Sequence, residues 1–100
     1  MEYRIEYTSV SEDHLRSLSA RDRRRVLDDV DRNLRFDAAT PARNRKRMRP
    51  NPLAPWELRT GDLRVYYDIE LEPEPVVYIN AVGLKLGNRV FIGGEELDLS

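Results

Sequence analysis

The chain has 100 residues, of which 40% are hydrophobic and 35% are charged, and its formal net charge is -1. It is too apolar for a disordered chain and too short for two domains, so we expect one folded domain over residues 1–100. The absence of cysteine excludes disulfides and thiolate metal sites. No apolar run reaches the roughly 18 residues of a membrane span, and no apolar signal region begins the chain, so we expect a cytoplasmic protein without a membrane partner.

Residues 2–7 alternate between apolar and charged side chains, which predicts a half-buried strand. Ser11 is the expected N-cap of a short helix, and Ser19 is the expected N-cap of a second one. An apolar stripe at helical spacing, which includes Val30 and Leu34, predicts the buried side of the second helix. Because very few residues separate the two helices, we expect them to form an antiparallel hairpin.

Residues 43–55 begin with a run of cations and then contain three prolines, so we expect an irregular loop. The rest of the chain reads as strands separated by turns rich in glycine and proline, followed by an acidic tail over residues 95–100. The strands are expected at Trp56–Arg59, Leu63–Leu71, Val76–Leu84 and Arg89–Ile92. The order β-α-α-β-β-β-β predicts an α+β fold in which two helices cover one face of a mostly antiparallel sheet.

Positive charge is concentrated in the first part of the chain. Residues 1–50 carry 13 Lys and Arg against 9 Asp and Glu, whereas residues 51–100 carry 4 against 9. The guanidinium group of Arg is well suited to phosphate, so this distribution favours an anionic partner. A solvated, arginine-rich surface or a cationic edge strand that resists aggregation would produce the same pattern, and both alternatives stay open.

One strand pair gives a sharper prediction. If the hairpin closes through the Thr-Gly-Asp turn, Arg59 and Arg64 fall directly opposite each other on the sheet face away from the helices, where they repel. An ion-pair ladder with Glu57 or Asp68 would offset this repulsion, and so would a bound phosphate. In the second case Tyr66, on the same face, would stack on a nucleotide or hydrogen-bond to it.

The sequence offers little else for catalysis. His14 is the only histidine, and its solvent-facing neighbours indicate a surface residue rather than a base. We find no metal-ligand cluster, no glycine-rich phosphate loop and no nucleophilic triad, so no metal and no cofactor are expected. Catalysis, if present, would depend on Arg, Lys and Tyr side chains.

The segment from Trp56 to Tyr67 reads WELRTGDLRVYY. It resembles the W-x-L-R-x-G-x-[YL]-R-[VL]-x-Y core of the RelE/ParE toxin superfamily. Residues 76–82, followed by Gly83 and Lys85, are similar to that family's next strand and its V-G-x-[RK] continuation, and the order of elements also matches. The resemblance spans nearly the whole chain. It implies the toxin of a bacterial type II toxin–antitoxin pair, which a cognate antitoxin protein wraps and blocks.

RelE-like members of this superfamily cut messenger RNA in the ribosomal A site, whereas ParE-like members poison DNA gyrase and have no nuclease activity. For a nuclease, the resemblance implies that Arg64 and Lys85 are catalytic and stabilise the scissile phosphate. Tyr66 or Lys85 would assist proton transfer. Phe91 falls near a position where some members use a catalytic tyrosine, and Glu57 falls where some have a lysine, so the survival of nuclease activity stays open.

Three functions therefore remain. They are a ribosome-dependent messenger RNA endoribonuclease that inhibits translation, a non-enzymatic toxin that binds gyrase, and a non-toxic relative that binds RNA or protein. For the first, ribosome and messenger RNA are the expected partners. The residues expected to bind RNA are Arg45, Lys46, Arg47, Arg49, Arg59, Tyr66 and Arg89.

Overall fold

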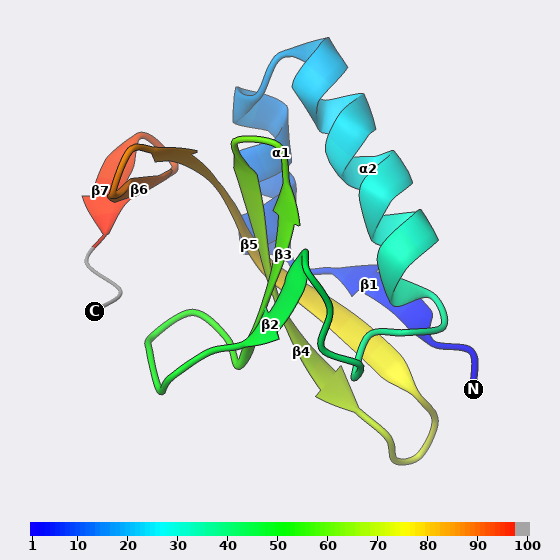
Figure 1. Cartoon of the computed structure of the whole chain (residues 1–100). Helices are drawn as coiled ribbons and strands as arrows, with labels where there is room; N and C mark the ends of the chain where they lie inside the picture. The colour runs from blue at the N-terminus through cyan, green and yellow to red at the C-terminus, as the bar shows by residue number, and fades with distance from the viewer. Residues whose placement is uncertain (98–100) are drawn as a thin grey trace.

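The computed structural model describes residues 1–97 (Figure 1). Its elements are β1 Arg4–Tyr7, α1 Ser9–Ser17, α2 Ala20–Leu34, β2 Arg45–Arg47, β3 Trp56–Thr60, β4 Leu63–Glu70, β5 Val76–Leu86, β6 Arg89–Ile92 and β7 Glu95–Leu97. This arrangement is the predicted α+β fold: an N-terminal strand, a helical hairpin and then a mostly antiparallel sheet. Neither helix within residues 1–97 has the length and apolar character needed to cross a membrane.

All the strands belong to one sheet. Its order is β2-β3-β4-β5-β6-β7 with antiparallel neighbours, and β1 lies off this path in a parallel pair with β5. Both β1 and β6 pair with β5, β1 along residues 76–79 and β6 along residues 83–86. Between these two partners α1 reaches the strand, because His14 Nδ1 accepts the Val82 N–H at 3.2 Å. The first helix therefore contacts β5 in the interval that β1 and β6 leave uncovered.

The helix starts follow side-chain capping, and one of the two predicted caps is wrong. Helix α1 is capped by Thr8, whose Oγ1 accepts the Ser11 N–H at 3.1 Å, and Ser11 lies inside the helix. An earlier start also lets the Thr8 N–H bond to Ile79 O at 3.1 Å, which couples the cap to β5. The prediction for α2 is confirmed, because Ser19 Oγ accepts the Asp22 N–H at 3.1 Å.

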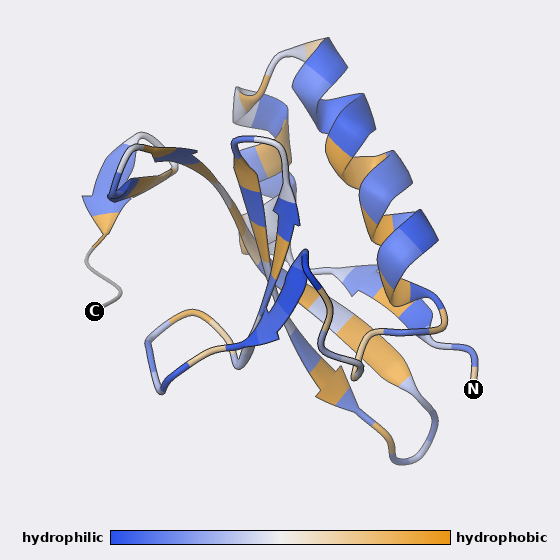
Figure 2. Cartoon of the chain, in the orientation of Figure 1, coloured by the Kyte–Doolittle hydropathy of each residue, from blue (hydrophilic) through white to orange (hydrophobic). Residues whose placement is uncertain are grey.

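The sheet has one covered face and one open face. The helices cover the first, where α2 presents its apolar stripe inward, as the alternating colours along that helix show (Figure 2). The main core on this face includes Val26, Val30, Leu34, Leu58, Val65, Tyr67, Val77 and Ile79, all at most 1% exposed. A smaller apolar cluster lies apart from this core and consists of Ala54, Tyr66, Ala81, Val90 and Ile92.

Two short strands complete the sheet. Strand β2 forms within residues 43–55, where an irregular loop was expected, and it pairs with β3 at the edge of the sheet, which fits the cationic edge strand that was left open for the basic run. Strand β7 forms at Glu95–Leu97, where an acidic tail was expected, and residues 98–100 of that tail lie outside the described residues. Three-residue edge strands are too short to show a period of two, and the pairing partner fixes them instead. Strand β5 also runs two residues beyond its expected end at Leu84, to Leu86.

Candidate anion-binding site

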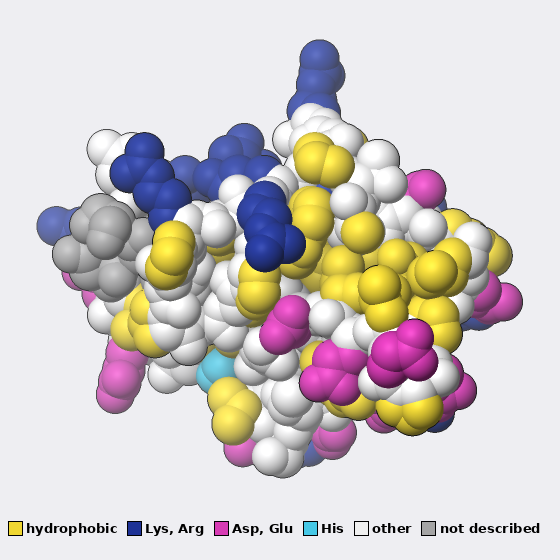
Figure 3. All heavy atoms as spheres, turned by 90° about the horizontal axis from the view of Figure 1, so that it is seen from below, with side chains coloured by type: hydrophobic (Ala, Val, Ile, Leu, Met, Phe, Trp, Pro, Cys, Tyr) yellow, Lys and Arg dark blue, Asp and Glu magenta, His cyan; other side chains and the backbone are white. Residues whose placement is uncertain are grey.

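The open face of the sheet is flanked by two projections. In Figure 1 the β6–β7 hairpin and the loop of residues 48–55 extend to the left, on the side opposite α2. Strands β3, β4 and β5 lie between them. Seen from below, most of the visible Lys and Arg side chains gather in the upper left half of the molecule, whereas Asp and Glu lie mainly lower (Figure 3). This side of the molecule is therefore rich in cations.

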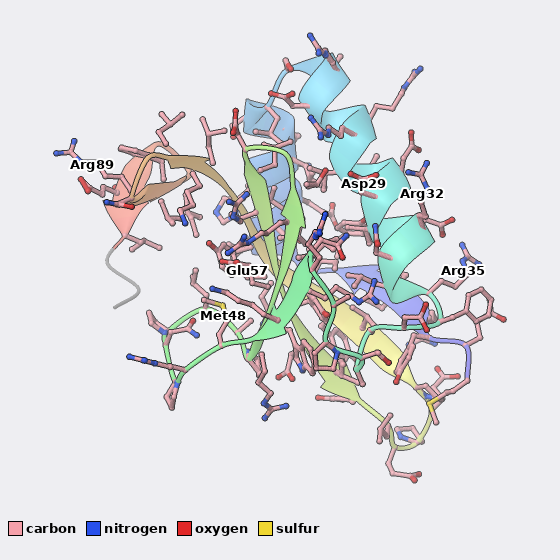
Figure 4. The ribbon with its side chains drawn as sticks, viewed as in Figure 1. Asp29, Arg32, Arg35, Met48, Glu57 and Arg89 are labelled. Atoms are coloured by element: carbon pink, nitrogen blue, oxygen red, sulfur yellow. The ribbon has the colours of Figure 1, made fainter. Side chains whose placement is uncertain are left out.

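The predicted juxtaposition of Arg59 and Arg64 is confirmed, since the two residues are direct partners in the β3–β4 ladder. Both approach the carboxylate of Glu57, whose Oε1 lies 3.7 Å from Arg59 Nε and 4.0 Å from Arg64 Nε. Lys46 Nζ on β2 is 3.9 Å from the same oxygen. Glu57 is only 6% exposed, and Figure 4 shows it in the middle of the sheet region.

These four residues form what we call the Glu57 cluster: Glu57, Lys46, Arg59 and Arg64. Arg59 and Arg64 both form ion pairs with Glu57, which is one of the two ways of offsetting their repulsion that the sequence left open. However, one carboxylate faces three cations at distances longer than a hydrogen bond, so a formal charge of +2 remains. An anionic ligand would complete the neutralisation.

Backbone hydrogen bonds hold the side chain of Arg64 in place. Arg64 is only 8% exposed, and its Nη1 donates to the carbonyl oxygens of Gly61 and Leu63, each at 2.8 Å. Within residues 1–97 its Nε is buried and has no hydrogen-bond partner. A buried donor without a partner is costly, and the Glu57 carboxylate, 4.0 Å from Nε, compensates the charge of this guanidinium only in part.

Tyr66 lies beside this group but cannot stack on a base. It is fully buried, which contradicts the expectation that its ring is available to a nucleotide. Its Oη has no hydrogen-bond partner within the described residues. Burial, and secondarily the charge of Glu57, raise the pKa of Tyr66 well above its ordinary value, so its phenol stays protonated.

Lys85 shares the open face by strand register. It lies two residues along β5 from Gly83, the cross-strand partner of Arg64, and side chains two apart on a strand point to the same face. It is partly buried, and its N–H donates to Asp62 O at 2.7 Å. The structure therefore places Lys85 on the same face of the sheet as Arg64.

The other predicted RNA-binding residues are dispersed. Alternation on β2 turns Arg45 and Arg47 away from Lys46. Arg45 Nε donates to Thr40 O at 3.0 Å, while Arg47 lies over the Trp56 ring at 5.8 Å from its centroid.

Arg49 and Arg89 come from the two projections. Arg49 is exposed in the loop that follows β2. Arg89 is exposed at the end of the β6–β7 hairpin, where its Nε lies 3.5 Å from Glu96 (Figure 4). Neither is an ion-pair partner of Glu57, so they flank the Glu57 cluster without joining it.

His14 is not the simple surface residue that was expected. It is half-buried, and its Nδ1 accepts a backbone hydrogen bond from Val82. Burial lowers the pKa of His14, while the neighbouring Asp13 opposes the shift. Because its imidazole is tied to the edge of β5, it is not a member of the Glu57 cluster.

Sequence reasoning missed a pocket beside the site. It has a volume of about 450 Å³, and its lining includes Asn51 of the proline-containing loop together with Asp68 and Asn80 of the sheet. Of the two carboxylates expected to pair with the arginines, Glu57 does so, whereas Asp68 Oδ1 accepts the Ile69 N–H at 2.7 Å. An Asn between two prolines was the available signal, since such residues commonly form side-chain-to-backbone turns.

A scan of the chain against models of known protein families finds no match, and a search of curated proteins finds no significant match.

Proposed function

We propose that this chain is the toxin of a bacterial type II toxin–antitoxin system, and that it cleaves messenger RNA on the ribosome in the cytoplasm. The observation that carries the proposal is the Glu57 cluster, where a single buried carboxylate faces three cations on an open sheet face. A surplus of Arg and Lys around a buried, unpartnered guanidinium Nε favours a phosphate ligand. The resemblance of residues 56–85 to RelE-like toxins supports RNA as the molecule that supplies this phosphate.

The cluster, together with Lys85 on the same face of the sheet, also supplies groups for RNA cleavage. The RNA 2′-oxygen attacks the adjacent phosphorus, the bond from phosphorus to the 5′-oxygen breaks, and a 2′,3′-cyclic phosphate and a free 5′-hydroxyl result. Glu57 takes the proton of the 2′-hydroxyl, and Lys85 gives a proton to the departing 5′-oxygen. Arg64 and Arg59 stabilise the charge on the phosphate oxygens. Tyr66 is not the base, because its raised pKa keeps the phenol protonated.

The decisive experiment follows cleavage of a messenger RNA with purified ribosomes present and absent. We expect cleavage only with ribosomes, and we expect Arg64→Ala to lower its rate by about 10²–10³-fold. Arg24→Ala is the matched control, because Arg24 is an exposed arginine on α2, away from the cluster. Circular dichroism checks that both variants fold. Undiminished cleavage by a folded Arg64→Ala protein would rule out this site.

Salt dependence gives a second test of the same surface. Each phosphate contact releases bound counterions, so ribosome binding should weaken steeply between about 50 and 200 mM salt. Arg59→Ala should reduce the magnitude of the slope of log affinity against log salt by about one, the contribution of a single phosphate contact. Arg24→Ala should leave the slope unchanged. An affinity that does not respond to salt would contradict phosphate binding at the cluster.

A gyrase-binding toxin is the second candidate, and one observation favours it. Phe91 on β6 has no hydroxyl, although some nuclease members use a tyrosine near this position. Expression would then induce a DNA damage response while messenger RNA stays intact. A non-toxic RNA- or protein-binding relative would instead permit normal growth without an antitoxin.

A further inference from the structure

The pocket beside the Glu57 cluster is built where the proline-containing loop meets β4 and β5. Its lining combines the apolar loop residues with the polar side chains of Asp68 and Asn80. In the β4–β5 ladder Tyr66 pairs with Ala81 and Tyr67 pairs with Ile79, so Asn80 is the extra residue of a β-bulge. Bulges commonly re-aim a side chain next to a functional site. The volume of about 450 Å³ falls within the range of small-molecule sites.

The pocket wall is held in place by side-chain amides. Asn51 Oδ1 accepts the N–H groups of Leu53 and Ala54 at 2.8 and 3.1 Å, and its Nδ2 donates to Arg49 O at 2.7 Å and to Ala54 O at 2.9 Å. Asn80 Nδ2 donates to Leu53 O at 3.2 Å and fastens the loop to the sheet. The loop is therefore preorganised, which lowers the entropic cost of binding a ligand.

The polar groups left over inside the pocket are acceptors. Asp68 uses Oδ1 for the Ile69 N–H, and its Oδ2 makes no hydrogen bond within residues 1–97. Asn80 uses its amide nitrogen for Leu53 O, which leaves its Oδ1 as an acceptor. Arg47 and Arg49 also line the pocket. The guanidinium of Arg47 lies over the Trp56 ring, so the exposed Arg49 is the arginine whose side chain supplies donors here. The pocket therefore offers two acceptors, one of them charged, with donors beside them.

Guanine is the nucleobase that matches this arrangement. Its Watson–Crick edge carries two neighbouring donors, N1–H and the N2 amino group, followed by the O6 acceptor. Adenine, cytosine and uracil each present only one donor group on that edge. Single-stranded RNA is commonly read by hydrogen bonds to the edges of unstacked bases, which stack on aromatic side chains or on the planes of Arg guanidinium groups. Arg49, in the pocket lining, is the side chain available for such stacking.

We propose that this pocket binds a guanine base of single-stranded RNA, with Asp68 accepting from N1–H and N2–H. The assignment of RNA as the source of the guanine rests on the proposed function. Asp68 lies two residues from Tyr66 on the same face of β4, a separation of about 6.6 Å along the strand. A base in the pocket thus adjoins the phosphate at the Glu57 cluster, and the pair of sites would give the toxin a sequence preference.

The test measures binding of free nucleotides, without ribosomes. GMP, AMP, CMP and UMP are titrated into the ¹⁵N-labelled chain, and the side-chain amide signals of Asn51 and Asn80 are followed by NMR. We expect GMP to bind about tenfold to a hundredfold more tightly than the other three. Asp68→Asn should remove this preference, because an amide nitrogen replaces the charged acceptor. Glu70→Gln is the matched control, since Glu70 is an exposed carboxylate farther along β4.

The outcomes separate this inference from the proposed function. Equal binding of all four nucleotides, or a guanine preference that survives Asp68→Asn, overturns the guanine pocket even if messenger RNA is cleaved. Selective GMP binding without any ribosome-dependent cleavage would retain the pocket and overturn the nuclease. When the guanine pocket and the nuclease activity are both present, the sites cleaved by the wild type should be enriched in guanine, and those cleaved by Asp68→Asn should not.

Discussion

The two faces of the sheet differ in how completely their polar groups are satisfied, as two neighbouring tyrosines on β4 show. Tyr66 and Tyr67 are both fully buried. On the helix-covered face, Tyr67 Oη donates to Ala38 O at 2.7 Å, and its ring stacks on Trp56 with centroids 5.9 Å apart. On the open face, Tyr66 Oη has no partner in the described chain. A buried group left unsatisfied calls for an explanation, and functional sites are where such groups are expected. The contrast therefore separates the well-satisfied helix-covered face from the face on which we place the proposed binding site.

The largest expected difference in stability comes from replacing one leucine by alanine on the helix-covered face and one in the loop beside the open face. Leu58→Ala removes a side chain with no exposure from the helix-covered core and should lower the free energy of unfolding by about 2–5 kcal/mol. Leu53→Ala, in the partly exposed loop of the pocket, should cost less than about 1.5 kcal/mol. Urea unfolding measures both. Equal losses would show that the two faces contribute to one core.

Charge removal should sharpen the same contrast. Glu57→Gln leaves three cations without their carboxylate and should lower the free energy of unfolding by about 1–3 kcal/mol at low salt, less at high salt. Asp31→Asn is the counterpart on α2, where Asp31 pairs with Arg35 at the surface, and it should cost less than about 1 kcal/mol. Unfolding at about 50 and 500 mM NaCl tests this. A salt-independent loss for Glu57→Gln would argue against cation repulsion.

The tyrosine pair gives a smaller and more specific effect. Tyr67→Phe leaves the Ala38 carbonyl without its donor and should cost about 1–2 kcal/mol. Tyr66→Phe removes a hydroxyl that makes no hydrogen bond within residues 1–97, so the folded state should be unchanged or slightly more stable. Thermal unfolding of the two variants is the measurement. A loss for Tyr66→Phe as large as that for Tyr67→Phe would reveal a partner for its Oη.

The smallest expected effect is a pH dependence at the contact between α1 and β5. The pKa of His14 is lowered in the folded chain, so its contribution to stability is present above the unfolded value of 6.5. That contribution is lost as the pH falls from 6.5 toward the folded pKa, because protonated Nδ1 cannot accept the Val82 N–H. Unfolding of the wild type at pH 7.5 and 5.5 should show a larger decrease than unfolding of His14→Asn. Identical slopes would exclude this role.

Several features could be predicted from local pattern. Alternation over residues 2–7 gave the first strand, and the apolar stripe through Val30 and Leu34 gave the inner side of α2. The tight turn before Leu63 fixed the pairing of Arg59 with Arg64, because strand register follows directly from a short turn. Even the sharing of one face by Glu57 and Arg64 followed from a side-chain period of two.

Long-range contacts determined which residues are buried and which hydrogen-bond partners they have, and local sequence patterns carry no information on either. The sequence by itself determined that cations would meet on one face of β3 and β4, since parity and turn length are local properties. Only the tertiary structure decided that Tyr66 would be buried and that Arg45 would bind the Thr40 carbonyl. The same holds for Asn80, which a bulge places beside a loop 27 residues away. Burial and partner choice depend on which segments pack together, and no window of sequence encodes that.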